Sequence, residues 1–140
     1  MNKYNNKNLY LDDLRIPDYS LGFEIVKNYE EFVRWIEDNG IPSLISFDHD
    51  LADLHYDPTT WRQGFEYHEK TGYDCAKWLV QYCEENKLEL NNCKLYVHSS
   101  NEYGSMNICT YLNNYLKHVG LDSKCLRNKW KSTWTSVEEK

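Results

Sequence analysis

Six side chains that bind metal ions or transfer protons stand where three predicted β-strands end. They are Asp12, Asp13, Asp48, His49, Asp50 and His98. The strands themselves are the apolar runs Leu9–Leu11, Ser43–Phe47 and Cys93–Val97. A parallel α/β sheet binds its ligands at the carboxyl ends of its strands. We therefore expect these side chains to form one shared site.

The first of these strand ends carries two adjacent carboxylates, Asp12 and Asp13. Adjacent carboxylates repel each other, and a hard divalent cation with oxygen ligands is their natural counter-charge. Together with Asp48 from the second strand end, they predict a site for Mg²⁺ or Mn²⁺. Two alternatives stay open at this point: Arg15 pairs with one of the carboxylates, or the pair lies in a solvated turn before Pro17.

Two histidines follow the second and third strands and are predicted to be catalytic. Imidazole changes its protonation near neutral pH and therefore serves as a general acid or base. We predict these roles for His49 and His98, with Asp50 fixing the tautomer of one of them. The alternatives are that Asp50 caps a helix beside a surface His49, and that His98 is a buried structural residue.

The third strand end also offers neutral groups that suit phosphate oxygens. The hydroxyl of Ser99 and the amide of Asn101 hydrogen-bond phosphate without adding charge, and we predict that they bind substrate together with Arg15. A helix predicted to begin near Ser105 directs its free N–H groups toward the same place. Alternatively, Ser99 and Asn101 only shape the turn before that helix.

The elements that position these residues alternate between strand and helix. Asn28 and Glu31 form an N-cap pair for one helix, and Thr71 with Asp74 forms a capping box for the next. A short strand, Phe23–Val26, precedes the first of these helices. Strands separated by helices imply right-handed crossovers and a largely parallel sheet.

Residues 1–140 are predicted to form one domain with two irregular segments. Residues 52–70 lack periodicity and are rich in aromatic side chains, which predicts a lid-like insertion. Residues 123–140 form a basic tail that contains tryptophan. We expect this tail to supply a last edge strand near Cys125-Leu126 or to lie across the site.

The composition is that of a globular chain without broad affinity for nucleic acid. The formal net charge of −6 argues against duplex DNA, and no apolar run approaches the length of a membrane span. The N-terminus is polar and lacks a signal peptide, so we expect a cytoplasmic protein. The five cysteines show no metal-ligand spacing and are predicted to be small, buried apolar residues in a reducing compartment. The sequence leaves the oligomeric state open.

Four motifs, taken in order, resemble those of one family. They are Leu11-Asp12-Asp13-x-Arg15-x-Pro17, Ile45-Ser46-x-Asp48-His49-Asp50-Leu51, Thr71-Gly72-Tyr73-Asp74, and Val97-His98-Ser99-x-Asn101 with Gly104 and Met106. Over about positions 9–116 the chain resembles the cyclic-phosphate processing receiver-like domain, a relative of the response-regulator receiver found in bacteria and phages. The resemblance implies a flavodoxin-like, three-layer αβα fold with strand order 2-1-3-4 and a candidate fifth edge strand.

The resemblance also implies roles for the acidic residues. Asp12 and Asp13 would be the metal-binding pair, and Asp48 would stand in the place of the receiver's phosphoacceptor aspartate. Family membership further implies a role on cyclic or terminal phosphates in RNA end processing. The chain departs from the family in its insertion Ala52–Lys70, and a fifth strand with the receiver's lysine is not evident. Lys129 is a candidate for that lysine only by its position.

These observations favour a metal-dependent phosphoesterase that acts on a small cyclic phosphate ester or on an RNA end. A metal-free reaction that uses only the two histidines stays open. The alternative function is a non-catalytic receiver-like module, in which Asp48 accepts phosphate or the domain binds a partner or a nucleotide. We favour the enzyme because a plain receiver has no need of His49 and His98 beside its acidic site.

Overall fold

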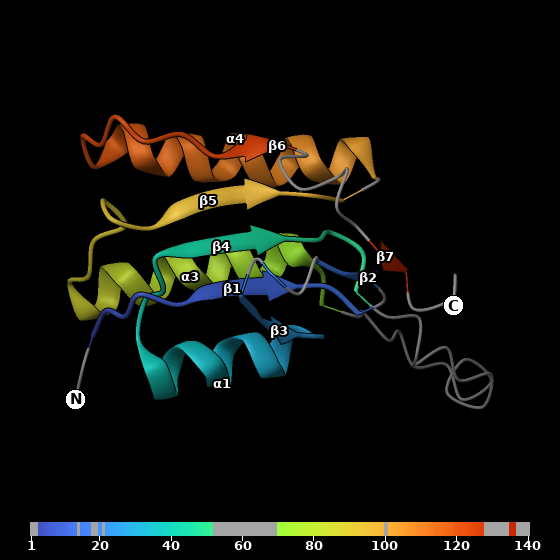
Figure 1. Cartoon of the computed structure of the whole chain (residues 1–140). Helices are drawn as coiled ribbons and strands as arrows, with labels where there is room; N and C mark the ends of the chain where they lie inside the picture. Colours follow the sequence, from blue (N-terminus) through green and yellow to red (C-terminus); the bar gives the residue numbers. More distant parts are fainter. Residues whose placement is uncertain are drawn as a thin grey trace, which may run out of the picture.

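Five parallel strands form the central sheet of the computed structural model, which describes residues 3–13, 15–17, 20, 22–51, 70–99, 101–127 and 135–136. The strands are β1 (Asn8–Leu11), β3 (Phe23–Val26), β4 (Leu44–Phe47), β5 (Lys94–Val97) and β6 (Leu126–Arg127). They lie in the order β3-β1-β4-β5-β6 (Figure 1). Counted along the chain, this order is 2-1-3-4-5. It confirms the flavodoxin-like, receiver-type fold and the fifth edge strand.

A second, two-stranded sheet pairs β2 (Arg15–Ile16) antiparallel with β7 (Thr135–Ser136). Both strands lie beyond the carboxyl ends of β1 and β4 in Figure 1. The chain near its C-terminus therefore returns to the edge of the main sheet at which the parallel strands end.

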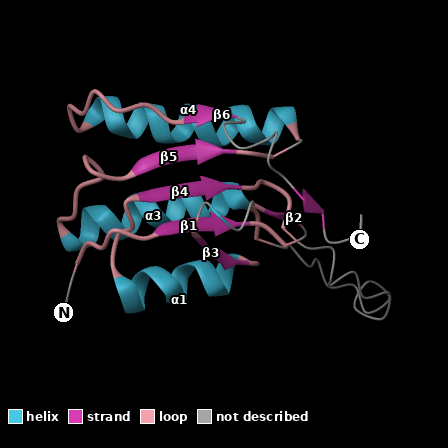
Figure 2. Ribbon diagram, viewed as in Figure 1, coloured by secondary structure: helices cyan, strands magenta, loops and turns pink. Residues whose placement is uncertain are grey.

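Three helices connect the strands and cover one face of the sheet. They are α1 (Tyr29–Asn39), α3 (Gly72–Asn86) and α4 (Glu102–His118). All three crossovers move in the same direction across the sheet, so right-handed connections place them on the same side. Phe32 of α1 illustrates this packing, because its ring lies 5.6 Å from that of Phe47 in β4 and 6.1 Å from that of Trp78 in α3. Of the three layers predicted, the described residues contain two, which are the sheet and this helical layer (Figure 2).

The central strands pair in register, which sorts their side chains into two faces. Leu11 lies opposite Phe47, and Phe47 lies opposite Val97. These three side chains belong to the apolar core that the helices cover. Since side chains alternate along a strand, Tyr10 and Ser46 point to the other face, where both are fully buried.

The first two predicted helix starts are confirmed. The side chain of Asn28 accepts a hydrogen bond from the backbone N–H of Glu31 and caps α1. Thr71 and Asp74 form the predicted capping box of α3, in which each side chain bonds the backbone N–H of the other residue. These bonds satisfy N–H groups that lack a partner inside the helix.

The last helix begins earlier than the sequence indicated. We expected a start near Ser105, but α4 begins at Glu102. The cause is Asn101, whose side-chain oxygen accepts a hydrogen bond from the backbone N–H of Gly104 at 2.9 Å. The Asn101-Glu102-Tyr103-Gly104 segment is therefore the capped first turn of the helix and not a separate turn before it.

All five cysteines are free and buried, as predicted for small apolar residues. They are Cys75, Cys83, Cys93, Cys109 and Cys125. Among the described residues, the longest helices are too short or too polar to traverse a lipid bilayer.

Two predicted segments fall mostly outside the described residues. The lid-like insertion was assigned to residues 52–70, of which only Lys70 is described. The tail of residues 123–140 is described at 123–127 and 135–136, and its first part supplies the predicted edge strand β6. Lys129 lies outside the described residues. The assignment of residues 1–140 to one domain stays a prediction.

The start of α3 provides a test of how the loop after β4 is packed. A Cβ atom added at Gly72 would overlap the carbonyl oxygen of Asp48 and lie 2.8 Å from its carbonyl carbon. We expect Gly72→Ala to lower the free energy of unfolding by about 3 kcal/mol or more, because backbone atoms cannot move aside as a flexible side chain does. Urea unfolding measures this loss.

Gly120→Ala is the matched control for that substitution. Gly120 has a φ of +80° and open space around its added Cβ, so only the conformational cost of about 1 kcal/mol applies. Equal losses for the two variants would show that the close approach at Gly72 is unimportant.

Candidate functional site

The first residues after three adjacent strands converge at the carboxyl edge of the sheet. Asp12 follows β1, Asp48 follows β4 and His98 follows β5. The hydrogen-bond ladder continues past the strands: Asp48 N–H donates to the Leu11 carbonyl at 3.0 Å, and His98 N–H donates to the Phe47 carbonyl at 2.9 Å. The alternation of side chains therefore also continues, and all three lie on the face of Tyr10 and Ser46. Neighbouring strands are about 4.8 Å apart, which sets the spacing of the group.

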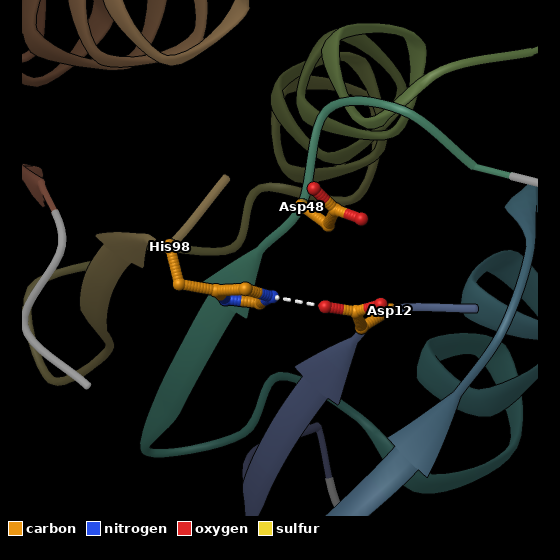
Figure 3. Close-up of side chains that lie close together, drawn as sticks. All are labelled: Asp12, Asp48 and His98. Atoms are coloured by element: carbon orange, nitrogen blue, oxygen red, sulfur yellow. Dashed lines mark hydrogen bonds and ion pairs between the residues drawn. The ribbon is translucent and has the colours of Figure 1, made fainter. Parts of the chain in front are cut away.

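These three residues form what we call the Asp12–Asp48–His98 cluster (Figure 3). One ligand atom from each lies within 4.8 Å of the others. Their exposed fractions are 2%, 6% and 0%. Two carboxylate oxygens and one imidazole nitrogen at this spacing can hold a metal ion.

Electrostatics make this cluster costly without a positive group. Two carboxylates at such a separation repel each other by about 3 to 4 kcal/mol at an effective dielectric constant near 20. His98 offsets part of this at Asp12, since its Nε2 lies 3.0 Å from the Asp12 Oδ2. Asp48 accepts a hydrogen bond from the backbone N–H of His49 at 2.8 Å. A divalent cation between the two carboxylates would neutralise both.

The His98 ring is held at both nitrogens and on one face. Its Nδ1 lies 2.6 Å from the hydroxyl oxygen of Ser46. The ring also stacks on Tyr10, with centroids 4.1 Å apart and planes 7° from parallel. Because an ionised carboxylate only accepts hydrogen bonds, Nε2–H donates to Asp12; when the ring is neutral, Nδ1 then accepts a hydrogen bond from the Ser46 hydroxyl.

Sequence reasoning did not assign a role to Ser46 or to Tyr10. The available signal was Ser46 itself, a polar residue inside the otherwise apolar strand Leu44–Phe47. A buried hydroxyl in such a strand needs a hydrogen-bond partner, and His98 on the adjacent strand provides it. The position of Tyr10 opposite Ser46 in the register then explains the ring stacking.

A second polar group follows Asp48 in the chain and contains His49, Asp50 and, from the start of α4, Asn101. His49 Nδ1 lies 2.8 Å from the Asp50 Oδ1, and the Asn101 amide nitrogen lies 3.2 Å from the same oxygen. An ionised carboxylate only accepts hydrogen bonds, so Nδ1–H of His49 donates to Asp50, which leaves Nε2 to carry the lone pair when the ring is neutral. The His49 side chain is 18% exposed, so the ring is neither fully buried nor free in solvent.

Two glycines make room for His49. The N–H of Gly72, the first residue of α3, donates to the His49 carbonyl at 2.8 Å. A Cβ atom added at Gly104, in the first turn of α4, would collide with the His49 ring and lie 2.8 Å from its Cβ. The loop after β4 is thus held between the N-terminal ends of two helices.

A family model for the cyclic-phosphate processing receiver domain matches residues 7–114. This chain belongs to that family. No curated protein and no solved structure matches this chain. The matched residues include the whole Asp12–Asp48–His98 cluster and the His49, Asp50 and Asn101 group.

Two predicted substrate-binding residues have local structural roles in this cyclic-phosphate processing receiver domain. Ser99 is 4% exposed; its hydroxyl accepts the Asn101 N–H at 3.1 Å and its carbonyl accepts the Ser105 hydroxyl at 3.1 Å. Asn101 caps α4 and donates to Asp50. Both residues therefore shape the start of the helix. Their roles in substrate binding stay predictions.

Two predicted site residues remain, Asp13 and Arg15. Asp13 is half-buried, and its carboxylate is not part of the Asp12–Asp48–His98 cluster found among the described residues. Its predicted role in metal binding stays a prediction. The backbone of Arg15 lies in β2, but its side chain falls outside the described part of the chain.

The Ser46–His98 hydrogen bond yields a prediction about stability. We expect Ser46→Ala to lower the free energy of unfolding by about 1 to 3 kcal/mol, because a buried ring nitrogen loses its donor. Ser43→Ala is the matched control, since Ser43 lies just before the same strand and its hydroxyl donates to the Lys7 carbonyl in an exposed position. We expect about 0.5 kcal/mol there. Thermal and urea unfolding of both variants measure the difference, and equal values would disprove the role of Ser46.

Proposed function

We propose that this cyclic-phosphate processing receiver domain is a metal-dependent phosphoesterase that opens cyclic phosphates by hydrolysis. The observation that carries the proposal is the buried Asp12–Asp48–His98 cluster at the carboxyl edge of the sheet. Family membership supports cyclic phosphates as the substrate class. The reaction adds one water to the phosphorus and breaks one ester bond of the ring, leaving a phosphate monoester and a free hydroxyl.

The donor set supports a transition-metal ion over magnesium. Magnesium prefers oxygen ligands in a near-octahedral arrangement, whereas imidazole nitrogen suits transition metals. Because His98 joins Asp12 and Asp48, we favour Mn²⁺ of the two ions that the sequence suggested. A bound divalent ion would supply neutralisation of the phosphate charge and polarisation of its bonds.

Within this proposal His98 is a ligand and not the acid or base that the sequence suggested. Its ring is fully buried and both nitrogens already have partners in Asp12 and Ser46. Ligation through Nε2 requires the proton to reside on Nδ1. The Ser46 hydroxyl supports that tautomer equally well, because it can accept a hydrogen bond as readily as donate one.

His49 is the residue that we propose for proton transfer. Its Nδ1–H donates to Asp50, which fixes the tautomer and leaves Nε2 able to take a proton from water. The same nitrogen can then return the proton to the leaving oxygen. Asp50 and Asn101 act here by positioning the ring.

Neutral donors near the cluster suit the remaining phosphate oxygens. The N-terminus of α4, a helix of 17 residues, lies at this edge and carries partial positive charge. We propose that Ser99 and Asn101 contact phosphate from this side and that Arg15 also binds phosphate. The net charge of −6 favours a small ester or a single RNA end over a duplex.

A second candidate function follows from the receiver fold itself. Asp48 ends a central strand, as the phosphoacceptor of a receiver does, so a signalling module is the alternative. Its low exposure of 6% and its place beside His98 favour the enzyme. Treatment with phosphoramidate followed by intact-mass analysis separates the two, since only the signalling module gains a phosphoryl group on Asp48.

Metal binding is the first test of the proposal. We expect Asp48→Asn to weaken Mn²⁺ binding by at least about 100-fold in calorimetry, because removal of a ligand costs more than removal of an outer-shell partner. Asp50→Asn is the matched control, since Asp50 lies two residues away and outside the cluster. Unchanged Mn²⁺ affinity in folded Asp48→Asn protein would refute the metal site.

Catalysis is tested on a panel of phosphates in the presence and absence of Mn²⁺ or Mg²⁺. The panel contains 2′,3′-cyclic mononucleotides, 3′,5′-cyclic nucleotides, ADP-ribose 1″,2″-cyclic phosphate and an RNA with a cyclic phosphate end. We expect hydrolysis that a chelator abolishes. His49→Ala should lower kcat by about 100-fold or more while Mn²⁺ affinity is kept.

His118→Ala provides the control for that variant, because His118 is an exposed residue in the last turn of α4, far along the helix from the site. It should retain full activity. Chelator-resistant turnover would favour the metal-free reaction by histidines. Absence of turnover in protein that binds metal would favour the signalling module.

A further inference from the structure

Two buried thiols on different elements lie in direct contact. The Sγ atoms of Cys109, in the middle of α4, and Cys125, immediately before β6, are 3.4 Å apart. The two residues are 7% and 5% exposed. Neither belongs to the site at the carboxyl edge of the sheet. A disulfide requires a sulfur separation near 2.05 Å, so closure needs an approach of about 1.3 Å.

The surrounding structure holds this pair in place. The backbone N–H of Cys125 donates to the side-chain oxygen of Asn113 at 2.7 Å, and Asn113 stands one helical turn beyond Cys109 on α4. The following residue, Leu126, is paired with Tyr96 of β5. The backbone at Cys125 is therefore held by the helix through its own N–H and by the sheet through the residue that follows it.

The pKa values of these two thiols are shifted in opposite directions. A hydrogen bond from the Cys125 thiol lowers the pKa of Cys109, and the positive charge of Arg127 lowers it further. The same hydrogen bond, together with burial, raises the pKa of Cys125. Burial also raises the pKa of Cys75 and raises that of Cys83 to about 12. Since the thiolate is the nucleophile, Cys109 is the reactive member.

We propose that Cys109 and Cys125 are a redox modification site that forms an intramolecular disulfide when the protein meets a peroxide. The Cys109 thiolate attacks one oxygen of hydrogen peroxide, the O–O bond breaks, and Cys109 becomes a sulfenic acid with release of one water. The Cys125 sulfur then attacks the Cys109 sulfur. The S–S bond forms, the S–O bond breaks, and hydroxide leaves as water with the Cys125 proton. Two thiols lose two electrons, and one peroxide is reduced to two waters.

The disulfide would join α4 to the fifth strand across a span of 16 residues. Such a crosslink restricts the unfolded chain more than the folded one, so the melting temperature rises on oxidation, by roughly 5 to 10 °C. A thiol reductant returns it to the starting value.

Tryptic mapping tests the proposal directly, because cleavage after lysine and arginine places each cysteine on its own peptide. Cys109 lies in peptide 95–117 and Cys125 in peptide 125–127, whereas Cys93 lies in peptide 88–94. We expect folded, peroxide-treated protein, alkylated before digestion, to yield the 95–117 peptide linked to the 125–127 peptide. Full alkylation of both thiols after peroxide, or a link between peptides 88–94 and 125–127 instead, would overturn the proposal.

Variants assign the order of the two steps. Cys125→Ser should trap the sulfenic acid at Cys109, which a dimedone probe labels on peptide 95–117. Cys109→Ser should leave Cys125 unlabelled and abolish the thermal shift. Cys93→Ala is the matched control, since Cys93 is a third buried thiol near Cys125, and it should retain both the linked peptide and the shift. Labelling of Cys125 in Cys109→Ser protein would contradict the assignment of Cys109 as the first thiol oxidised.

Discussion

The site depends on the in-register parallel pairing of β1, β4 and β5. Leu11, Phe47 and Val97 stand level with one another, and the next residue of each strand is a potential ligand. A slip of one residue between two strands would turn one of these side chains to the helical face, among apolar groups. The same strand register therefore buries the apolar side chains under the helices and brings the polar side chains together at the sheet edge. This agreement explains how potential ligands more than 30 residues apart in the chain meet at one edge of the sheet.

Polar groups that lie within the sheet support the charged ones at its edge. A buried imidazole or carboxylate loses hydration, and only well-placed hydrogen bonds recover that loss. Ser46 and Asp12 serve the two nitrogens of His98, while the Tyr10 ring covers its face. The orientation of the His98 ring is therefore set by residues on the strands and at their ends, whose positions vary less than those of a loop.

Much of the fold and the location of the site followed from the sequence, whereas the exact grouping did not. Apolar runs that end in Asp12, Asp48 and His98 indicated strand ends, and a parallel sheet brings such ends together. Adjacency in sequence groups Asp13 with Asp12, whereas the buried cluster joins Asp12 to residues from two other strands, which adjacency does not indicate. The contact of Ser46 with His98 depends on which strands are adjacent, and the start of α4 depends on a single side-chain cap at Asn101. Neither can be read from periodicity alone.

The contact between Gly104 and His49 makes the site sensitive to the position of a whole helix. A helix is stiff along its axis, so α4 moves largely as a rod of about 25 Å. Its first turn touches the His49 ring, and its middle touches the residue before the fifth strand through Cys109. A small axial shift of α4 at one of these contacts would therefore also move the helix at the other. The edge of the sheet and the His49 imidazole therefore both contact the same helix, although no side chain in the described part of the chain links them directly.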